Sequence, residues 1–158
     1  MSSAWPRGTP ADAMSPRGTG SAMQHAGGCA CGRLRFRSLA APVDSGYCHC
    51  RICQRTSGAP LLAYVSFPVA AFAYTAGTPS RYASSASGSR EFCSACGTQI
   101  AFRRSADAVT VDVNVGAMDE PAAYPPARHI WCESAIPWLR FADSLPRFAR
   151  GTEAGPAG

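Results

Sequence analysis

Short runs in which apolar and polar residues alternate fill the chain between about residue 25 and residue 150. In "GRLRFRS", Leu34 and Phe36 alternate with three arginines. The clearest run, "AVTVDVNVG", places its valines on one face, at Val109, Val111, Val113 and Val115. A period of two is typical of a half-buried β-strand, so both runs predict strands with one face towards a core.

Three further runs complete the predicted β structure. "APLLAYVSF" is almost continuously apolar and predicts a buried strand between Pro60 and Pro68, since proline seldom continues a strand. "FAYTAGTPSRYAS" predicts a strand, a turn containing glycine and a second strand. "REFCSACGTQIAFRR" predicts a hairpin with two cysteines at its tip, and with Ile100 and Phe102 facing inward on the return strand.

Helix is expected in short pieces only. Residues 51–56 and 135–141 have room for a turn or two, and Pro137 limits the second piece. The large apolar residues near the C-terminus are expected to close the core: Trp131, Trp138, Leu139, Phe141 and Phe148. The fold class predicted is therefore mainly β, with a single domain over residues 25–150 made of short antiparallel strands and zinc knuckles.

Composition limits the size and the setting of this domain. At 158 residues the chain suits one domain. Residues 1–24 are rich in Ala, Pro, Gly and Ser and predict a disordered extension, and residues 151–158 predict a loose tail. The N-terminus has no apolar core of a signal peptide, and no run approaches the roughly 18 apolar residues of a membrane span. We therefore expect a cytoplasmic protein whose cysteines stay reduced.

Seven of the eight cysteines form three compact groups: Cys29 with Cys31, Cys48 with Cys50 and Cys53, and Cys93 with Cys96. In a reducing compartment such spacing indicates metal ligands rather than disulfides. Zinc commonly takes four thiolates from two short clusters that lie far apart in the sequence. The first and third groups together predict such a structural zinc site, and Gly97 lets the chain turn beneath the ion.

The middle group then has three thiolates. Catalytic zinc commonly has three protein ligands and one exchangeable position, so the count of four plus three predicts one structural and one reactive Zn²⁺ per chain. Three alternatives stay open for the triplet: His49 as fourth ligand, Cys132 as fourth ligand, or thiols without a metal. An iron–sulfur cluster would also require four cysteines.

Charge gives little support for a nucleic-acid partner. The formal charge is +5, but seven thiolates and two zinc ions would lower it to about +2. The arginines of "GRLRFR" and "AFRR" alternate with apolar strand positions, which is typical of a solvated strand face, and no recognition helix is predicted. We expect neither a nucleic-acid nor a membrane partner.

Four motifs resemble one protein family in order and separation: "GGCACGRLRF", "YCHCRICQRTSG", "FCSACGTQIAF" and "RHIWCESAIPWLRFADSLPRF". The family is that of the glutathione-dependent formaldehyde-activating enzyme and centromere protein V, and the resemblance covers about residues 27–149. It implies a β-tent zinc fold. It also implies a structural zinc on Cys29, Cys31, Cys93 and Cys96, and a second zinc on Cys48, Cys50 and Cys53.

The resemblance implies a carbon–sulfur lyase that joins glutathione, or a similar thiol, to formaldehyde or a related aldehyde. Its chemistry would take place at the cysteine triplet. By residue type His49 is a candidate general acid or base, with a buried structural histidine as the alternative. His129 is expected to pack or to form hydrogen bonds.

Glutathione carries two carboxylates, so its site needs cations or free N–H groups. Candidates for this binding follow or interleave the triplet: Arg51, Gln54, Arg55 and Thr56. The alternative is that the two arginines are only solvent-exposed on a short turn. The rival function is a non-catalytic zinc module that binds another protein.

Overall fold

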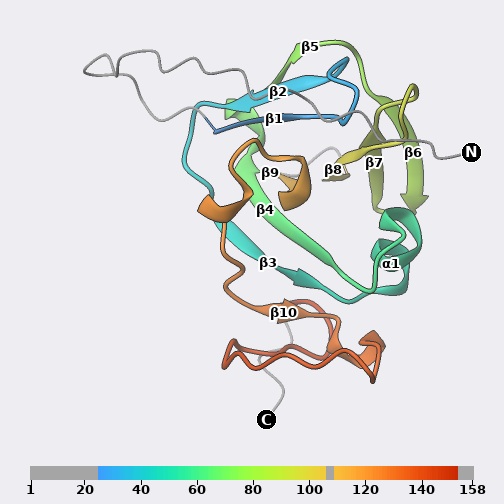
Figure 1. Cartoon of the computed structure of the whole chain (residues 1–158), viewed down its shortest axis with the longest axis vertical. Helices are drawn as coiled ribbons and strands as arrows, with labels where there is room; N and C mark the ends of the chain where they lie inside the picture. The colour runs from blue at the N-terminus through green and yellow to red at the C-terminus, as the bar shows by residue number, and fades with distance from the viewer. Residues whose placement is uncertain (1–24, 106–108, 153–158) are drawn as a thin grey trace, which may run out of the picture.

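The computed structural model describes residues 25–105 and 109–152 (Figure 1). The predicted disordered extension, residues 1–24, and residues 153–158 of the predicted loose tail lie outside the described residues. The described part of the chain is mainly β, with one α-helix, as the sequence predicted.

The strands form two sheets. The smaller sheet has the order β1 (His25–Gly28), β2 (Arg35–Ser38) and β5 (Phe72–Ala76). The larger has the order β10 (His129–Ile130), β3 (Asp44–Cys48), β4 (Leu62–Pro68), β9 (Thr110–Asn114), β8 (Gln99–Arg104), β7 (Gly88–Phe92) and β6 (Ser80–Ser85). Helix α1 (Arg51–Ser57) connects β3 to β4. The pairing is antiparallel except between β10 and β3.

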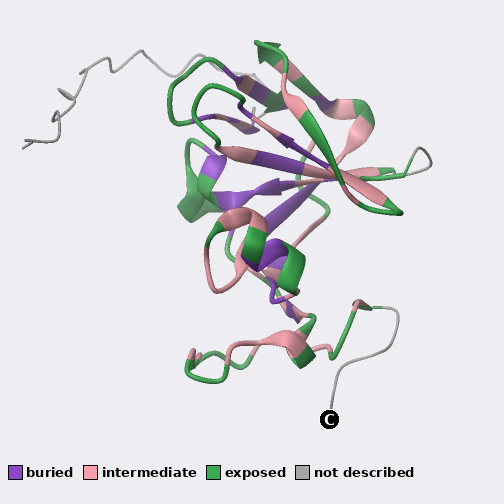
Figure 2. Ribbon diagram, turned by 90° about the vertical axis from the view of Figure 1, so that its right-hand side faces the viewer, coloured by how far each residue is buried: buried purple, intermediate pink, exposed green. Residues whose placement is uncertain are grey.

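The core lies between the two sheets, where the buried segments of Figure 2 meet. Val65 of β4 and Val111 and Val113 of β9 are fully buried, and they belong to one cluster with Phe36 of β2. The alternation predicted for the valines is thus confirmed, except at Val109. Val109 precedes the first residue of β9 and is 78% exposed.

The hairpin of β7 and β8 is confirmed, but one of its two predicted core positions is wrong. The register shifts between Glu91 and Phe92, so the β8 strand carries one extra residue. Such a bulge reverses the alternation that follows it. Ile100 and Ala101 are therefore both fully buried, whereas Phe102 turns to the outer face of the sheet, beneath the guanidinium of Arg90.

The C-terminal apolar residues do not close the core, contrary to the prediction. Trp131 and Trp138 are exposed, and Leu139, Phe141 and Phe148 are only partly buried. The reason is that this segment pairs with itself: the His129 N–H donates to Pro146 O at 2.8 Å. It forms the separate lower layer of Figure 1, beside β10, with a 3₁₀ turn at Cys132–Ser134 and no helix over 135–141.

In the part of the chain that the structure describes, no helix has the length and apolar character needed to cross a bilayer.

Candidate metal centres and the adjoining cavity

The first metal centre lies between two turns, one from each sheet. The first turn joins β1 to β2 in the smaller sheet, and the second joins β7 to β8 in the larger sheet. Cys29 and Cys31 follow β1, and Cys93 and Cys96 follow β7; their sulfurs all lie within 4.8 Å of one another. The Cys29 and Cys31 sulfurs are 3.5 Å apart, and those of Cys31 and Cys93 are 3.8 Å apart. Four sulfurs around one tetrahedral zinc lie about 3.8 Å apart, so this four-cysteine cluster fits one ion.

Backbone and hydroxyl groups hold this cluster in place. The Leu34 N–H donates to Cys29 Sγ at 3.1 Å. Thr98 Oγ1 accepts from the Ala30 N–H at 3.1 Å and lies 3.2 Å from Cys96 Sγ, so one hydroxyl connects the two turns. The hydrogen bond from Thr98 lowers the pKa of Cys96 to about 5, which favours the thiolate that a metal requires.

The second centre, the cysteine triplet, forms where β3 passes into α1. Cys48 ends β3, Cys50 is the N-cap of the helix, and Cys53 lies one turn further on; their sulfurs lie within 4.8 Å of one another. The Cys53 N–H donates to Cys50 Sγ at 3.3 Å, which is the usual N-cap contact. Because side chains three apart share a helix face, the cap and Cys53 converge.

The three thiols do not ionise alike. Hydrogen bonds from Cys48 and then Cys53 lower the pKa of Cys50 to about 2. Hydrogen bonds to Cys50 and Cys53, together with burial, raise the pKa of Cys48 far above its usual range. Cys50 therefore forms a thiolate readily. Cys48 keeps its proton until a strong cation, such as a metal ion, replaces that proton on the sulfur.

Neither alternative fourth ligand joins the triplet. Among the described residues, only these three cysteines make up the cluster. Cys132 is half-buried and belongs to neither cluster. A metal ion held by this triplet would keep one position for another ligand, which is the arrangement of a reactive rather than a structural site.

His49 is buried in a chain of hydrogen bonds that runs away from the triplet. Its Nε2 lies 2.9 Å from His129 Nδ1, and His129 Nε2 lies 3.1 Å from a carboxylate oxygen of Asp143. Because the carboxylate must accept, His129 donates through Nε2, and one proton is shared between His49 Nε2 and His129 Nδ1. Burial, and then the charge of His129, lower the pKa of His49 and keep it neutral. This environment supports the structural alternative for His49.

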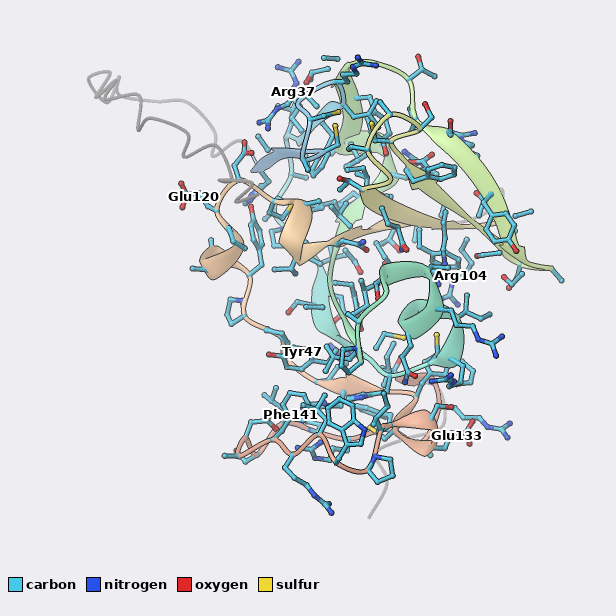
Figure 3. The ribbon with its side chains drawn as sticks, turned by 45° about the vertical axis from the view of Figure 1, so that its right-hand side comes forward. Arg37, Tyr47, Arg104, Glu120, Glu133 and Phe141 are labelled. Carbon is cyan, nitrogen blue, oxygen red and sulfur yellow. The ribbon has the colours of Figure 1, made fainter. Side chains whose placement is uncertain are left out.

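A cavity of about 480 Å³ opens beside the triplet. All three cysteines line it, and α1 and the turn after β10 enclose it; Arg104 and Glu133, labelled in Figure 3, both lie along its wall. The floor of the cavity is the outer face of the larger sheet. There, β4 and β9 pair Tyr64 with Asn114, and β8 and β9 pair Phe102 with Asp112. The polar positions of β9, which alternate with the core valines, thus line a cavity.

Arg90 is a site residue that the sequence analysis missed. It lies on β7 opposite Phe102, is 6% exposed, and donates through Nη2 to Cys53 Sγ at 3.3 Å. With the Gln99 amide oxygen turned towards it, Arg90 Nη1 also donates to Gln99 at 2.8 Å. Arg90 forms no ion pair within the described residues, and the nearby carboxylate that interacts with it electrostatically is that of Asp112 on β9. A buried cation is stabilised by anionic neighbours, and its contact with Cys53 Sγ favours the thiolate form of the triplet.

The four residues expected to bind glutathione have different positions. Arg51 lines the cavity. Gln54 is buried and donates to His49 O at 2.6 Å and Ser134 O at 3.0 Å, so it ties α1 to the turn after β10. Arg55 is exposed and off the cavity wall, and Thr56 Oγ1 donates to Ile52 O at 2.9 Å within the helix.

The fold and the two centres define a mainly β domain with two cysteine clusters suited to metal ions, one of them open to a cavity. The sequence model of the family "glutathione-dependent formaldehyde-activating enzyme" matches residues 24–134. The chain belongs to this family, as its motifs predicted.

The fold is also found among solved structures. A crystal structure of a Rhodobacter sphaeroides protein is similar to this chain, with 20% sequence identity and a TM-score of 0.50. The similarity covers 60% of this chain and 87% of that chain. No curated protein matches the sequence significantly.

Proposed function

We propose that this chain is a carbon–sulfur lyase that joins glutathione, or a similar small thiol, to an aldehyde in the cavity beside the triplet. The observation that carries this proposal is the triplet itself: three converging thiols at the wall of a cavity, with no fourth donor from the described residues. Membership of the family supports the reaction class.

The donor sets suit two zinc ions. The four-cysteine cluster would hold a structural ion, and Cys48, Cys50 and Cys53 would hold the second. When bound at the triplet, zinc would lower the pKa of an incoming thiol and so supply thiolate at neutral pH.

The chain's own residues prepare the cavity for an anionic sulfur. Three thiolates around a divalent ion carry a net charge of −1, which would repel a further thiolate. The Arg90 guanidinium, 3.3 Å from Cys53 Sγ, offsets that charge. Leu62 and Ile130 pack against the triplet and exclude water from it, which strengthens the attraction.

Two more cations are available for the carboxylates of glutathione. Arg51 and Arg104 both line the cavity, and neither forms an ion pair with a described residue. Guanidinium groups bind carboxylates in a bidentate manner, so these arginines would orient the tripeptide with its sulfur towards the triplet.

The reaction is an addition and needs no oxidant. The thiol releases its proton to solvent, its sulfur attacks the carbonyl carbon to form a C–S bond, and the C=O π bond breaks. The resulting alkoxide takes a proton from solvent. The product is a hydroxyalkyl thioether of glutathione, and the reverse reaction is the lyase direction.

The test measures the exchange rate between ¹³C-formaldehyde and its glutathione adduct by NMR, because the adduct also forms without catalysis. The protein should accelerate exchange, and Cys50→Ser should not. Cys132→Ser is the matched control and should retain the acceleration, since Cys132 lies in neither cluster. If the unmodified protein accelerates no thiol–aldehyde pair, the non-catalytic zinc module is the better account.

A further inference from the structure

The cavity is apolar where the chemistry would take place. In the larger sheet, Cys48 pairs with Leu62 of β4 on one side and with Ile130 of β10 on the other. Directly paired residues point to the same face of a sheet, so both apolar side chains flank the Cys48 sulfur. Both also pack against the cluster formed by the buried cysteines.

Two large apolar side chains extend this wall to the surface. Ile52 of α1 is 42% exposed and Trp131 is 37% exposed, and both line the cavity. Exposed apolar groups that gather on one cavity mark a surface that an apolar ligand covers.

The backbone of Trp131 is in a conformation that large residues avoid. Trp131 has φ of 60°, and it is the only non-glycine residue with positive φ in the described ranges. Such a conformation is strained for a residue with a side chain, and it persists where surrounding bonds impose it. Here the Trp131 N–H donates to Arg150 O at 2.9 Å, and Trp131 O accepts from the Ser134 N–H at 3.0 Å. The strained turn holds Trp131 at the cavity wall.

Neither proposed substrate has an apolar group that would use this wall. Glutathione is a charged tripeptide, and formaldehyde has a single carbon. We infer that the aldehyde accepted by this chain carries a branched alkyl or aryl group, which lies against Leu62, Ile130 and Trp131. Glutathione then occupies the part of the cavity lined by Arg51 and Arg104. This inference rests on the proposed function. The addition balances as before, with R–CHO in place of formaldehyde.

Two stable thioethers of glutathione test this inference by calorimetry, without any turnover. S-benzylglutathione mimics the adduct of an aryl aldehyde, and S-methylglutathione mimics that of formaldehyde. Burial of a phenyl group against an apolar wall should tighten binding by at least about tenfold. Equal affinities for the two compounds would overturn the inference.

Trp131→Gly locates the effect. Glycine suits the positive φ, so the turn should fold without the ring. The preference for S-benzylglutathione should fall at least about threefold, since one wall of the apolar site is lost. Trp138→Gly, which removes an exposed indole away from the cavity, is the matched control and should keep the full preference. An equal loss in both variants would contradict the inference.

The two proposals fail in different ways. If S-methylglutathione binds as tightly as the benzyl compound, and exchange of formaldehyde is catalysed, the proposed function stands and the inference is wrong. If neither compound binds and no aldehyde reacts, both are wrong. If kcat/KM for benzaldehyde exceeds that for formaldehyde, relative to the uncatalysed rates, both are supported.

Discussion

The two cysteine clusters use the same ligand atoms for different purposes. The four-cysteine cluster joins the turn after β1 to the turn after β7, and so connects the smaller sheet to the larger across more than sixty residues of chain. The triplet lies within six consecutive residues and connects only β3 to α1. A cross-link between distant segments restricts the unfolded chain far more than a local one. Stability should therefore depend on the first cluster and chemistry on the second.

The two cysteine clusters also differ in how exposed their sulfurs are and in which groups support them. Cys31 and Cys96 of the first cluster are exposed, and their support comes from backbone N–H groups and the Thr98 hydroxyl. Two of the three cysteines of the triplet are buried, beside a cavity, and a buried cation, Arg90, donates to Cys53 Sγ. The number of donors indicates which centre is open, and the cavity and Arg90 indicate what an open centre would bind.

The largest expected effect is on stability, from Cys96→Ser. Loss of one ligand from a structural zinc site should weaken a cross-link whose full binding free energy is about 10–16 kcal/mol in small zinc domains. A loss of a few kcal/mol lowers Tm by about 10 °C in a domain of this size. Thermal unfolding followed by circular dichroism measures it, with Cys132→Ser as the control. An unchanged Tm for Cys96→Ser would show that this cluster is no cross-link.

The converse effect is expected from Cys50→Ser, which should reduce thiol–aldehyde exchange by about 100-fold or more by removing a ligand of the open centre. Its Tm should fall by less than about 5 °C, because the serine hydroxyl can still cap α1 as the sulfur does. NMR exchange and thermal unfolding of the same sample check both. Equal thermal losses in Cys50→Ser and Cys96→Ser would remove the distinction between the clusters.

Arg90→Met should weaken metal binding at the triplet by about 10–100-fold, the usual range for a group that supports a ligand. Methionine fills similar space but leaves the thiolate charge without its counter-ion. Competition with a chromogenic chelator measures the affinity of each ion. Arg37→Met is the control, because it removes an exposed arginine of the smaller sheet, labelled in Figure 3. It should change the affinity for neither metal ion. Unchanged affinity in Arg90→Met would show that the thiolates need no counter-charge from the chain.

The smallest expected effect is from Thr98→Val at the four-cysteine cluster. The lost hydroxyl should lower affinity for that ion by less than about tenfold, because water can replace it at the exposed Cys96. The same chelator titration gives the value. If Thr98→Val lowered metal affinity more than Arg90→Met does, Thr98 would support its cluster more strongly than Arg90 supports the triplet, contrary to this prediction.

Local features were predictable from the sequence because short spacing determines them. The hairpin that carries Cys93 and Cys96 follows from the two-residue gap between them, and the short helix expected over residues 51–56 lies within α1. The grouping of cysteines into four and three likewise needed no structure.

Features that depend on strand order were not predictable. Arg90 lies 37 residues from Cys53, and only the placement of β7 over α1 brings them together. The bulge that turns Phe102 outward appears in the register alone. Trp131 and Trp138 looked like core residues because they are large and apolar, but the C-terminal segment pairs with itself and leaves them exposed.

The central claim is that the triplet binds an ion of its own, separable from the one that holds the sheets together. Metal content per chain, measured by elemental analysis on protein purified without chelator, tests it directly in the unmodified protein and in Cys50→Ser. The account predicts two zinc ions in the first and about one in the second, with the fold retained in both. One ion in both proteins would contradict it.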